Sequence, residues 1–377
     1  MSVAGVIFSN IHDETIPEIT RQRTIGSVPF GCRYRLVDFS LSNMVNAGIE
    51  NIGIITNHNY QSLLDHIGTG KDWDLARRKG GIKILPPYIT SFDQPIELKI
   101  NAHRLESLKG VSPFFKDLKD DYIVFSDCDS ICNIDLKKII DTHKETEADL
   151  TIVVKDLYVQ GYEGKNLTIV DSDAHGNVTS VRPSGTLQKG FYNVSINVMV
   201  FTKKYIVDLL AEAKSAGYVS FREQLIPARI GKDKIKIYKY DSYYSAINSL
   251  RDYYTCNMDL LKTDVRHALF DVPNRPVLTR IKNSPPTYYA KGSRVVNSLI
   301  ADGCRIEGTV ENSIIFRGVH IEEGVTVKNS ILMPNTTLLE NCFVNCLIAD
   351  KNVVIREGRM LSGHETRPFY LEKNAVI

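Results

Sequence analysis

A short apolar sequence centred on asparagine recurs near the carboxyl end of this chain. Its four copies are Val295–Leu299, Val310–Ile314, Val327–Ile331 and Phe343–Leu347. The asparagines stand at 297, 312, 329 and 345, so the steps are 15, 17 and 16 residues. Such a period, with aliphatic residues every five or six positions, is typical of β-helix coils that stack their aliphatic side chains inward. We expect each asparagine to turn a corner, because Asn tolerates a left-handed φ.

The rest of the chain alternates strand and helix signals. The strand runs are Val3–Phe8, Ile52–Thr56, Tyr122–Ser126 and Leu150–Val154, and the helical patterns include Val37–Ala47, which stops at Gly48, and Asp135–Lys144. This alternation predicts an α/β domain with a largely parallel sheet. Ligands of such sheets lie beyond the carboxyl ends of the strands. The loop after Phe8 and the acids after Phe125 are therefore candidate site segments.

These patterns divide the chain into three segments. We place an α/β domain at 1–263, a linker at 264–290 and a β-helix domain at 291–377. The linker holds Pro273, Pro276, Pro285 and Pro286, and helical periodicity disappears there.

Composition argues against several classes of function. The net charge is +2, so nothing favours bulk attraction to nucleic acid or to a membrane surface. No apolar run approaches the ~18 residues of a membrane span, and the amino end lacks the basic region of a signal peptide. The seven scattered cysteines read as reduced thiols, which predicts a cytoplasmic protein.

Several local sequences resemble one family of enzymes. Gly31–Phe39 (GCRYRLVDF), His66–Trp73 (HIGTGKDW) and Asn257–Leu261 (NMDLL) are similar to strings of ADP-glucose pyrophosphorylase, a sugar-phosphate nucleotidyltransferase. The resemblance covers essentially the whole chain. It implies a Rossmann-like nucleotidyltransferase domain followed by a left-handed parallel β-helix.

The resemblance also implies a reaction, in which ATP and glucose 1-phosphate give ADP-glucose and pyrophosphate. Such a site needs a glycine loop whose N–H groups approach the triphosphate. It also needs an Arg and a Lys to neutralise that charge, and two carboxylates from separate strands to hold Mg²⁺. A further Lys grips the sugar phosphate.

The first half of this machinery is replaced here. The family's glycine loop, Gly-Gly-x-Gly-Thr-Arg-Leu, corresponds to a stretch that begins Ser9-Asn10 and contains neither glycine nor arginine. Asp13 and Glu14 would instead stand near the phosphate path. Ile25 occupies the place of the next lysine.

The second half is also altered. Asp129 matches the first metal-binding aspartate, with Asp127 as a rival, whereas Ala246 occupies the position of the second. The sugar-phosphate lysine corresponds to Arg182. Asn101 stands in the segment that matches the motif for base recognition. Ser9, Asn10, Asn101 and Arg182 thus mark a vestigial substrate pocket, and Asp129 marks a vestigial metal site.

The combined losses resemble the regulatory, non-catalytic subunit that accompanies the catalytic subunit in Gram-positive bacteria. The resemblance implies a heterotetramer with the catalytic chain, in glycogen synthesis, and leaves contact with further copies of this chain open. Mg²⁺ and ATP would then belong to the catalytic partner, with no cofactor assigned to this chain. Two alternatives stand beside this interpretation: an active nucleotidyltransferase with a rebuilt site, and a sugar-phosphate sensor or assembly module.

Four arginines surround the altered loop. They are Arg21, Arg23, Arg33 and Arg35. In the family, basic residues of this stretch bind phosphorylated effectors near the β-helix. We therefore expect them to contact a phosphorylated sugar or another subunit, with solvated surface arginines and salt bridges as the alternative.

Overall fold

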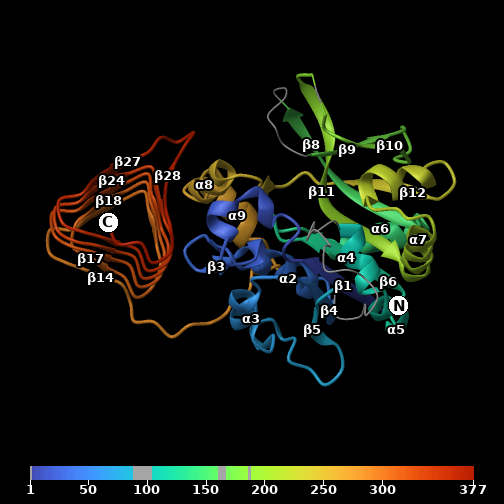
Figure 1. The fold of residues 1–377 in the computed structure, drawn as a ribbon, viewed down its shortest axis with the longest axis horizontal. Helices are drawn as coiled ribbons and strands as arrows, with labels where there is room; N and C mark the ends of the chain where they lie inside the picture. The colour runs from blue at the N-terminus through green and yellow to red at the C-terminus, as the bar shows by residue number, and fades with distance from the viewer. Residues whose placement is uncertain (1, 88–103, 160–166, 186–187) are drawn as a thin grey trace.

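The computed structural model describes residues 2–87, 104–159, 167–185 and 188–377. An α/β domain is followed by a triangular prism of short strands (Figure 1). None of the helices in these residues combines the length and apolar character that crossing a bilayer requires.

The α/β domain is built on a nine-stranded mixed sheet. Its main path runs β10-β9-β11-β6-β1-β4-β5, and β8 joins β11 to β12. The strands are β1 Val3–Phe8, β4 Asn51–Ile55, β5 Gly81–Leu85, β6 Tyr122–Asp127, β8 Leu150–Val159, β9 Thr168–Ser172, β10 Val178–Pro183, β11 Gly190–Thr202 and β12 Ile235–Lys239. The central strands β6, β1, β4 and β5 are parallel, as the sequence predicted, whereas β11 is antiparallel to both β6 and β8.

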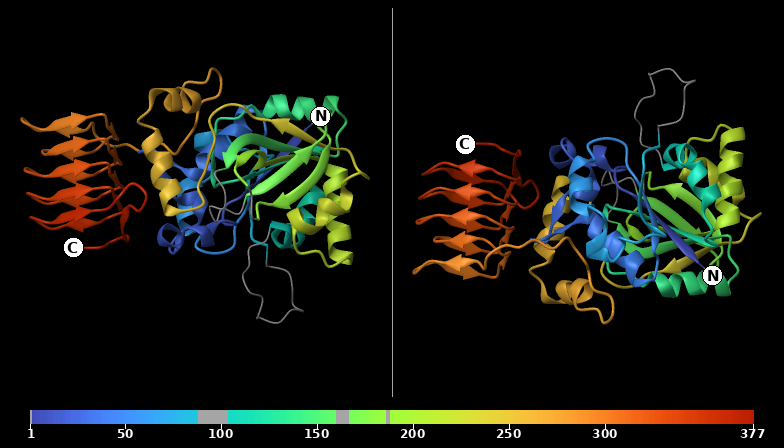
Figure 2. Two further views of the ribbon diagram at one scale, coloured as in Figure 1. Left: turned by 90° about the horizontal axis from the view of Figure 1, so that it is seen from above. Right: turned by 90° about the horizontal axis from the view of Figure 1, so that it is seen from below.

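Helices cover both faces of this sheet (Figure 2). They are α1 Pro17–Thr20, α2 Leu36–Asn46, α3 Gln61–Ile67, α4 Arg104–Gly110, α5 Ser112–Asp117, α6 Leu136–Glu145, α7 Lys203–Ser215, α8 Leu250–Asp259 and α9 Thr263–Phe270. Short helical turns are η1 Asp13–Thr15, η2 Ile25–Ser27, η3 Lys71–Trp73, η4 Phe221–Leu225 and η5 Pro227–Arg229. The ends of two helices follow from sequence: Asp135 caps α6 by accepting from the Lys138 N–H, and Gly48, with φ of +77°, lies just past α2.

The α/β domain also contains two short two-stranded sheets. One pairs β2 Pro29–Phe30 with β3 Tyr34–Arg35, and the other pairs β7 Ser130–Ile131 with β13 Ser245–Ala246.

The carboxyl-terminal prism has three five-stranded parallel sheets as its faces, as in a left-handed β-helix. One face contains β14 Tyr288–Tyr289, β17 Arg305–Ile306, β20 His320–Ile321, β23 Thr337–Leu338 and β26 Val354–Ile355. The next contains β15 Arg294–Val296, β18 Thr309–Glu311, β21 Thr326–Lys328, β24 Phe343–Asn345 and β27 Met360–Ser362. The last contains β16 Leu299–Ile300, β19 Ile314–Ile315, β22 Ile331–Leu332, β25 Leu347–Ala349 and β28 Phe369–Leu371.

The corner prediction is confirmed for the first three repeats and wrong by one residue for the fourth. Asn297, Asn312 and Asn329 have φ of +43°, +47° and +44°. In the fourth repeat Val327 pairs with Val344, so Cys346, with φ of +49°, takes the corner that we had given to Asn345. The sequence misled because an asparagine stands one position before the true corner.

The linker prediction also needs a correction. Residues 264–290 are not free of helix, because α9 occupies Thr263–Phe270. Its buried residues Val265 and Leu269 lie four apart and pack into the core of the α/β domain. Two apolar residues one helical turn apart are too short a pattern to indicate a helix in a segment rich in proline.

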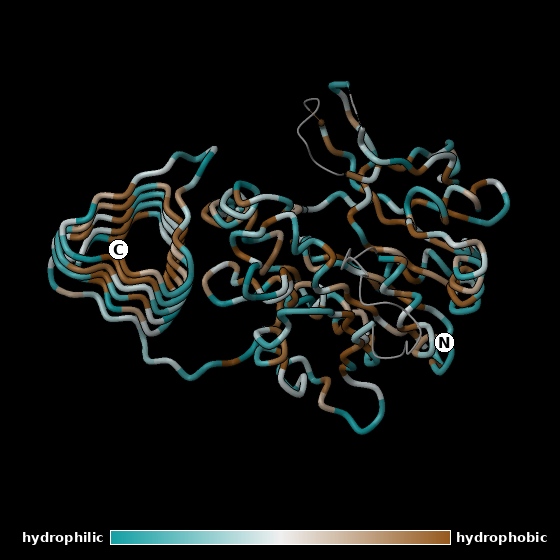
Figure 3. Tube along the Cα trace, viewed as in Figure 1, coloured by the Kyte–Doolittle hydropathy of each residue, from teal (hydrophilic) through white to brown (hydrophobic). Residues whose placement is uncertain are grey.

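The apolar core extends across the joint between the two domains. Phe316, Met333 and Ile348 of the β-helix are buried and belong to the same cluster as Phe30 and Tyr253 of the α/β domain. The tube in Figure 3 shows apolar residues along the walls of the prism and on the central strands. The two domains therefore pack against each other through an apolar contact.

Candidate functional site

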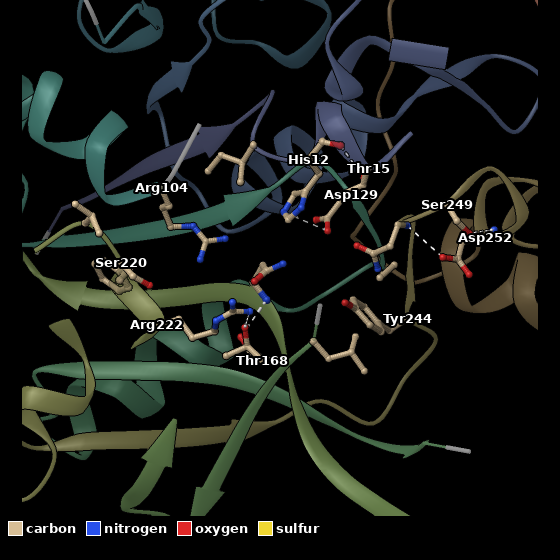
Figure 4. A pocket seen from close by; sticks show the side chains of 18 residues that line it. His12, Thr15, Arg104, Asp129, Thr168, Ser220, Arg222, Tyr244, Ser249 and Asp252 are labelled. Carbon is tan, nitrogen blue, oxygen red and sulfur yellow. Dashed lines mark hydrogen bonds and ion pairs between the residues drawn. The ribbon is translucent and has the colours of Figure 1, made fainter. Parts of the chain in front are cut away.

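The candidate site is a pocket at the carboxyl edge of the central sheet (Figure 4). Strands β1 and β6 run side by side, with Phe8 paired to Asp127, so the segments that follow them emerge together. The pocket has a volume of about 350 Å³. Its neutral polar lining consists of Thr15, Thr168, Ser195, Asn197, Ser220, Tyr244, Asn248 and Ser249.

The loop after β1 turns its first two side chains inward and away from this pocket. Ser9 is fully buried, and its Oγ donates to the Ile55 carbonyl at 2.9 Å. Asn10 is buried as well, and neither end of its amide finds a hydrogen-bond partner among the described residues. Backbone groups are also committed, because the N–H of Asp13 bonds the Asn10 carbonyl and that of Thr15 bonds the His12 carbonyl. Fewer N–H groups remain for a phosphate than in a glycine loop.

Asp13 lies behind the loop, not beside the phosphate path as we expected. Its Oδ1 accepts from the Ile25 N–H at 2.6 Å, and the side chain is buried. Burial raises the pKa of Asp13 to about 8. Ile25 itself packs in the apolar core, where the family has a lysine. The loop is thus held by a backbone N–H of residue 25 and by the apolar packing of its side chain.

His12 reaches from this loop to the two acids after β6. Its Nε2 lies 2.9 Å from Asp127 Oδ2 and 3.4 Å from Asp129 Oδ2. Arg104, at the start of α4, forms an ion pair with the same Asp127 oxygen. Asp127 and Asp129 are almost completely buried. Of the two rival aspartates, only Asp129 lines the pocket, although both belong to the cluster.

The charges of this cluster balance one another. Burial disfavours the charged form of His12, but Asp129 and Asp127 outweigh it and raise the pKa of His12 to about 9. Burial raises the pKa of Asp129, and Asp127 adds to the rise. Burial acts on Asp127 in the same direction, yet Arg104 and His12 hold its pKa below the usual range. Two cationic side chains therefore face two carboxyl groups at neutral pH.

A magnesium ion held between carboxylates of two strands does not fit these residues. Ala246 lines the pocket beside Asp129, because β13 pairs Ala246 with Ser130 and the Ile247 N–H bonds the Asp129 carbonyl. The position is correctly placed for a second ligand, but it offers a methyl group. The other pocket carboxylate, Asp252, accepts from the Asn248 N–H at 3.3 Å near the start of α8. Magnesium prefers several oxygen ligands in octahedral geometry.

The predicted sugar-phosphate residue does not reach the pocket. Arg182 is exposed on β10, pairs with Asp171 at 3.3 Å and is absent from the pocket wall. Arg222 of η4 is the cation that faces the cavity from that side, with Nη1 3.5 Å from Thr168 Oγ1 (Figure 4). Asn101 lies outside the described residues.

A second pocket, of about 340 Å³, lies between the α/β domain and the β-helix. We call it the cation pocket, because its wall includes Arg33, Arg35, Arg280, Lys282, Arg317 and Lys351. Two of these, Arg33 and Arg35, were predicted effector contacts.

Burial and the repulsion between neighbouring cations lower the pKa values of several side chains in the cation pocket. Burial, with Arg35 and Arg23 nearby, lowers the pKa of Lys351 to about 7. Burial and neighbouring arginines lower the pKa of Lys282 as well. Burial also lowers the pKa of Arg35 to about 10. Six cations gather here, of which Arg35, Arg317 and Lys351 are half-buried, and such a concentration of positive charge favours an anionic ligand.

The other two predicted arginines bind the β-helix of their own chain. Arg23 is buried and forms a bidentate pair with Asp350, at 2.9 and 2.7 Å. Arg21 pairs with Glu372 at 3.3 Å, and both side chains are largely exposed. The four arginines thus separate into two that pair with acids of the β-helix and two that line the cation pocket.

Sequence reasoning missed several residues of both pockets. His12 stood in the altered loop, but only its carboxylate neighbours drew attention. Arg104 and Arg222 follow no family string that we compared. Lys351 meets Arg35 only because the β-helix folds back onto the α/β domain.

Comparisons with known proteins agree with this architecture. Residues 16–263 match the nucleotidyl transferase family, and residues 287–367 match the family described as GlmU-like, C-terminal hexapeptide. The chain is 32% identical to glycogen biosynthesis protein GlgD of Bacillus subtilis (strain 168), over 99% of this chain and 96% of that protein. It is 29% identical to glucose-1-phosphate adenylyltransferase of Bacillus thuringiensis (strain Al Hakam), over 91% of this chain and 90% of that protein.

The adenylyltransferase of Bacillus anthracis is equally similar, at 29% identity over the same shares. The resemblance to the ADP-glucose pyrophosphorylase family is therefore confirmed over nearly the full length. This chain belongs to the nucleotidyl transferase family, in the group that joins the catalytic fold to a hexapeptide β-helix and includes the glycogen biosynthesis protein GlgD.

Proposed function

We propose that this chain is a non-catalytic, regulatory subunit of glucose-1-phosphate adenylyltransferase and acts in glycogen biosynthesis. The observation that carries the proposal is Ala246, whose methyl group lines the pocket beside Asp129 where a second metal-binding carboxylate would lie. The folded-down loop and the buried Ile25 support it. Mg²⁺, ATP and glucose 1-phosphate would be handled by a catalytic partner subunit.

The alternative of a rebuilt active site loses support from the position of Arg182. That interpretation relied on Arg182 to grip a sugar phosphate, but the side chain pairs with Asp171 outside the pocket. It also required a replacement for Ala246. Asp252 is the other carboxylate in the pocket wall, and it accepts from the Asn248 N–H.

Regulation would enter through the cation pocket, in our proposal, by binding of a phosphorylated sugar. An anion there would contact Arg35 of the α/β domain, Arg280 of the linker, and Arg317 and Lys351 of the β-helix. Because it would bridge both domains, its binding energy would favour one arrangement of the joint. A partner subunit that packs against both domains would then respond to the changed domain arrangement.

Restoring one lost group should not restore turnover. In the variant Ala246→Asp, we expect no pyrophosphate release above that of the unmodified chain, because the loop at Ser9 and the missing lysine at Ile25 remain. The measurement is pyrophosphate release from ATP, glucose 1-phosphate and Mg²⁺. Ala246→Asn, which has the same shape without the charge, is the matched control. Turnover by the aspartate variant alone would show that the loop does not prevent catalysis.

The assembly part of the proposal is tested by co-expression with a catalytic adenylyltransferase subunit. We expect a mixed tetramer in native mass spectrometry. Separate homo-oligomers, with no exchange on mixing, would contradict the role as a subunit.

A further inference from the structure

His12, Asp127 and Asp129 bring three metal-ligating groups together at the wall of the first pocket, which His12 and Asp129 line. Their nearest ligand atoms all lie within 4.8 Å of one another. We propose that these residues form a binding site for a divalent transition metal of the Zn²⁺ or Co²⁺ type. This site differs from a magnesium site between two strands, because a ring nitrogen from the altered loop replaces the carboxylate lost at Ala246.

The spacing of the atoms suits such an ion. Metal–ligand bonds of ~2.0–2.2 Å in tetrahedral geometry place neighbouring ligand atoms ~3.4 Å apart. His12 Nε2 lies 3.4 Å from Asp129 Oδ2 and 2.9 Å from Asp127 Oδ2. Small rotations of the side chains would therefore admit an ion without a change in the backbone.

The surroundings of the acids also resemble those of metal ligands. Asp127 Oδ1 is buried and has no hydrogen-bond partner among the described residues, so one lone-pair site is open. Asp129 Oδ1 accepts from Ser130 Oγ at 3.1 Å, which would orient that carboxylate. Hydrogen bonds of this kind fix ligand orientation in metal sites.

The ligand types determine which ions would bind. An imidazole nitrogen suits Zn²⁺ or Co²⁺ better than Mg²⁺, which prefers oxygen ligands and retains water. Three protein ligands leave a further coordination position. Because His12 and Asp129 line the pocket, that position would face the cavity. With Arg104 beside Asp127, the loaded site would carry net positive charge and attract an anionic oxygen.

Arg104 competes with the metal for Asp127. Arg104 forms an ion pair with the same Oδ2 atom that contacts His12. Together, Arg104 and the protonated His12 ring neutralise the two acids. An entering ion would displace the ring proton. Removal of Arg104 should therefore strengthen metal binding, an effect that a nonspecific surface site would not show.

The test is equilibrium dialysis of the full chain against Zn²⁺, Co²⁺ or Mg²⁺ at fixed pH, with bound metal counted by mass spectrometry. We expect one Zn²⁺ or Co²⁺ per chain, unaffected by excess Mg²⁺. His12→Gln and Asp129→Asn should each weaken binding by more than about ten-fold, whereas Arg104→Gln should tighten it. His58→Gln is the matched control, because His58 also lies near a carboxylate, at 3.7 Å from Asp13, but outside the cluster.

The spectrum of bound Co²⁺ separates nitrogen and oxygen ligands from the thiolates of the seven cysteines. Metal held by thiolates, binding unchanged by both ligand variants, or no saturable binding would each overturn the proposal. None of these outcomes bears on whether the chain turns over substrate, so the proposed function is tested separately.

Discussion

Replacing Arg23 with alanine should lower the free energy of unfolding by about 3 kcal/mol. The guanidinium and the carboxylate of Asp350 are both at least 97% buried and meet in a bidentate pair. Without Arg23, the hydrogen-bond donors left to the Asp350 carboxylate among the described residues would be the Tyr370 hydroxyl and the Lys351 N–H. An uncompensated buried charge is far more costly than the loss of the pair as a whole.

Arg21→Ala is the matched control for this variant. Arg21 also pairs with an acid of the β-helix, but Arg21 and Glu372 are 73% and 67% exposed, so the change should be below about 1 kcal/mol. Urea denaturation of both variants measures the difference. The double variant Arg23→Met, Asp350→Leu should recover much of the loss. Equal effects at positions 21 and 23 would contradict a buried link between the domains.

Sulfate should bind the cation pocket more tightly at pH 6 than at pH 8, by about ten-fold. The change comes from Lys351, whose pKa is lowered to about 7 by burial and by Arg35 and Arg23, against the opposing effect of Asp350. A bound anion favours the charged lysine and raises its pKa. The affinity for sulfate is therefore highest below pH 7. It falls as the pH rises through 7, because the Lys351 amine loses its proton.

Calorimetric titration at constant ionic strength measures this dependence, and sulfate is used because it does not itself titrate in this range. Lys351→Met should bind sulfate weakly at both pH values and lose the dependence. Arg294→Met is the control, because this arginine lies on the β-helix outside the pocket wall. A pH-independent affinity in the unmodified chain would place the anion away from Lys351.

Much of the fold could be predicted because its signals are local and repeated. The stacked aliphatics at Val310 and Val327 specify a coil whatever lies elsewhere in the chain. The buried strand Val3–Phe8 needed only its apolar run. The fourth corner and α9 were misjudged because each depends on a single residue or a single turn, which tertiary packing decided.

The site could be predicted only where function follows a fixed register. Asp129 and Ala246 are neighbours because the short strands β7 and β13 pair. The resemblance to the family had already matched these two residues to its two metal-binding positions. The prediction that Arg182 lies in the pocket was wrong because side chains alternate along β10. Val181 is buried against the sheet, so Arg182 points to the opposite side. The cation pocket was only half predicted, because Arg280, Arg317 and Lys351 lie on segments far along the chain from Arg35.

The most direct test of the central claim is pyrophosphate release from ATP and glucose 1-phosphate with Mg²⁺. It should be measured with this chain alone and then with this chain mixed with a catalytic subunit. A regulatory subunit predicts no turnover alone and an altered rate or effector response in the mixture. Turnover by the purified chain alone, free of any catalytic partner, would show that the altered pocket is an active site and would contradict the account.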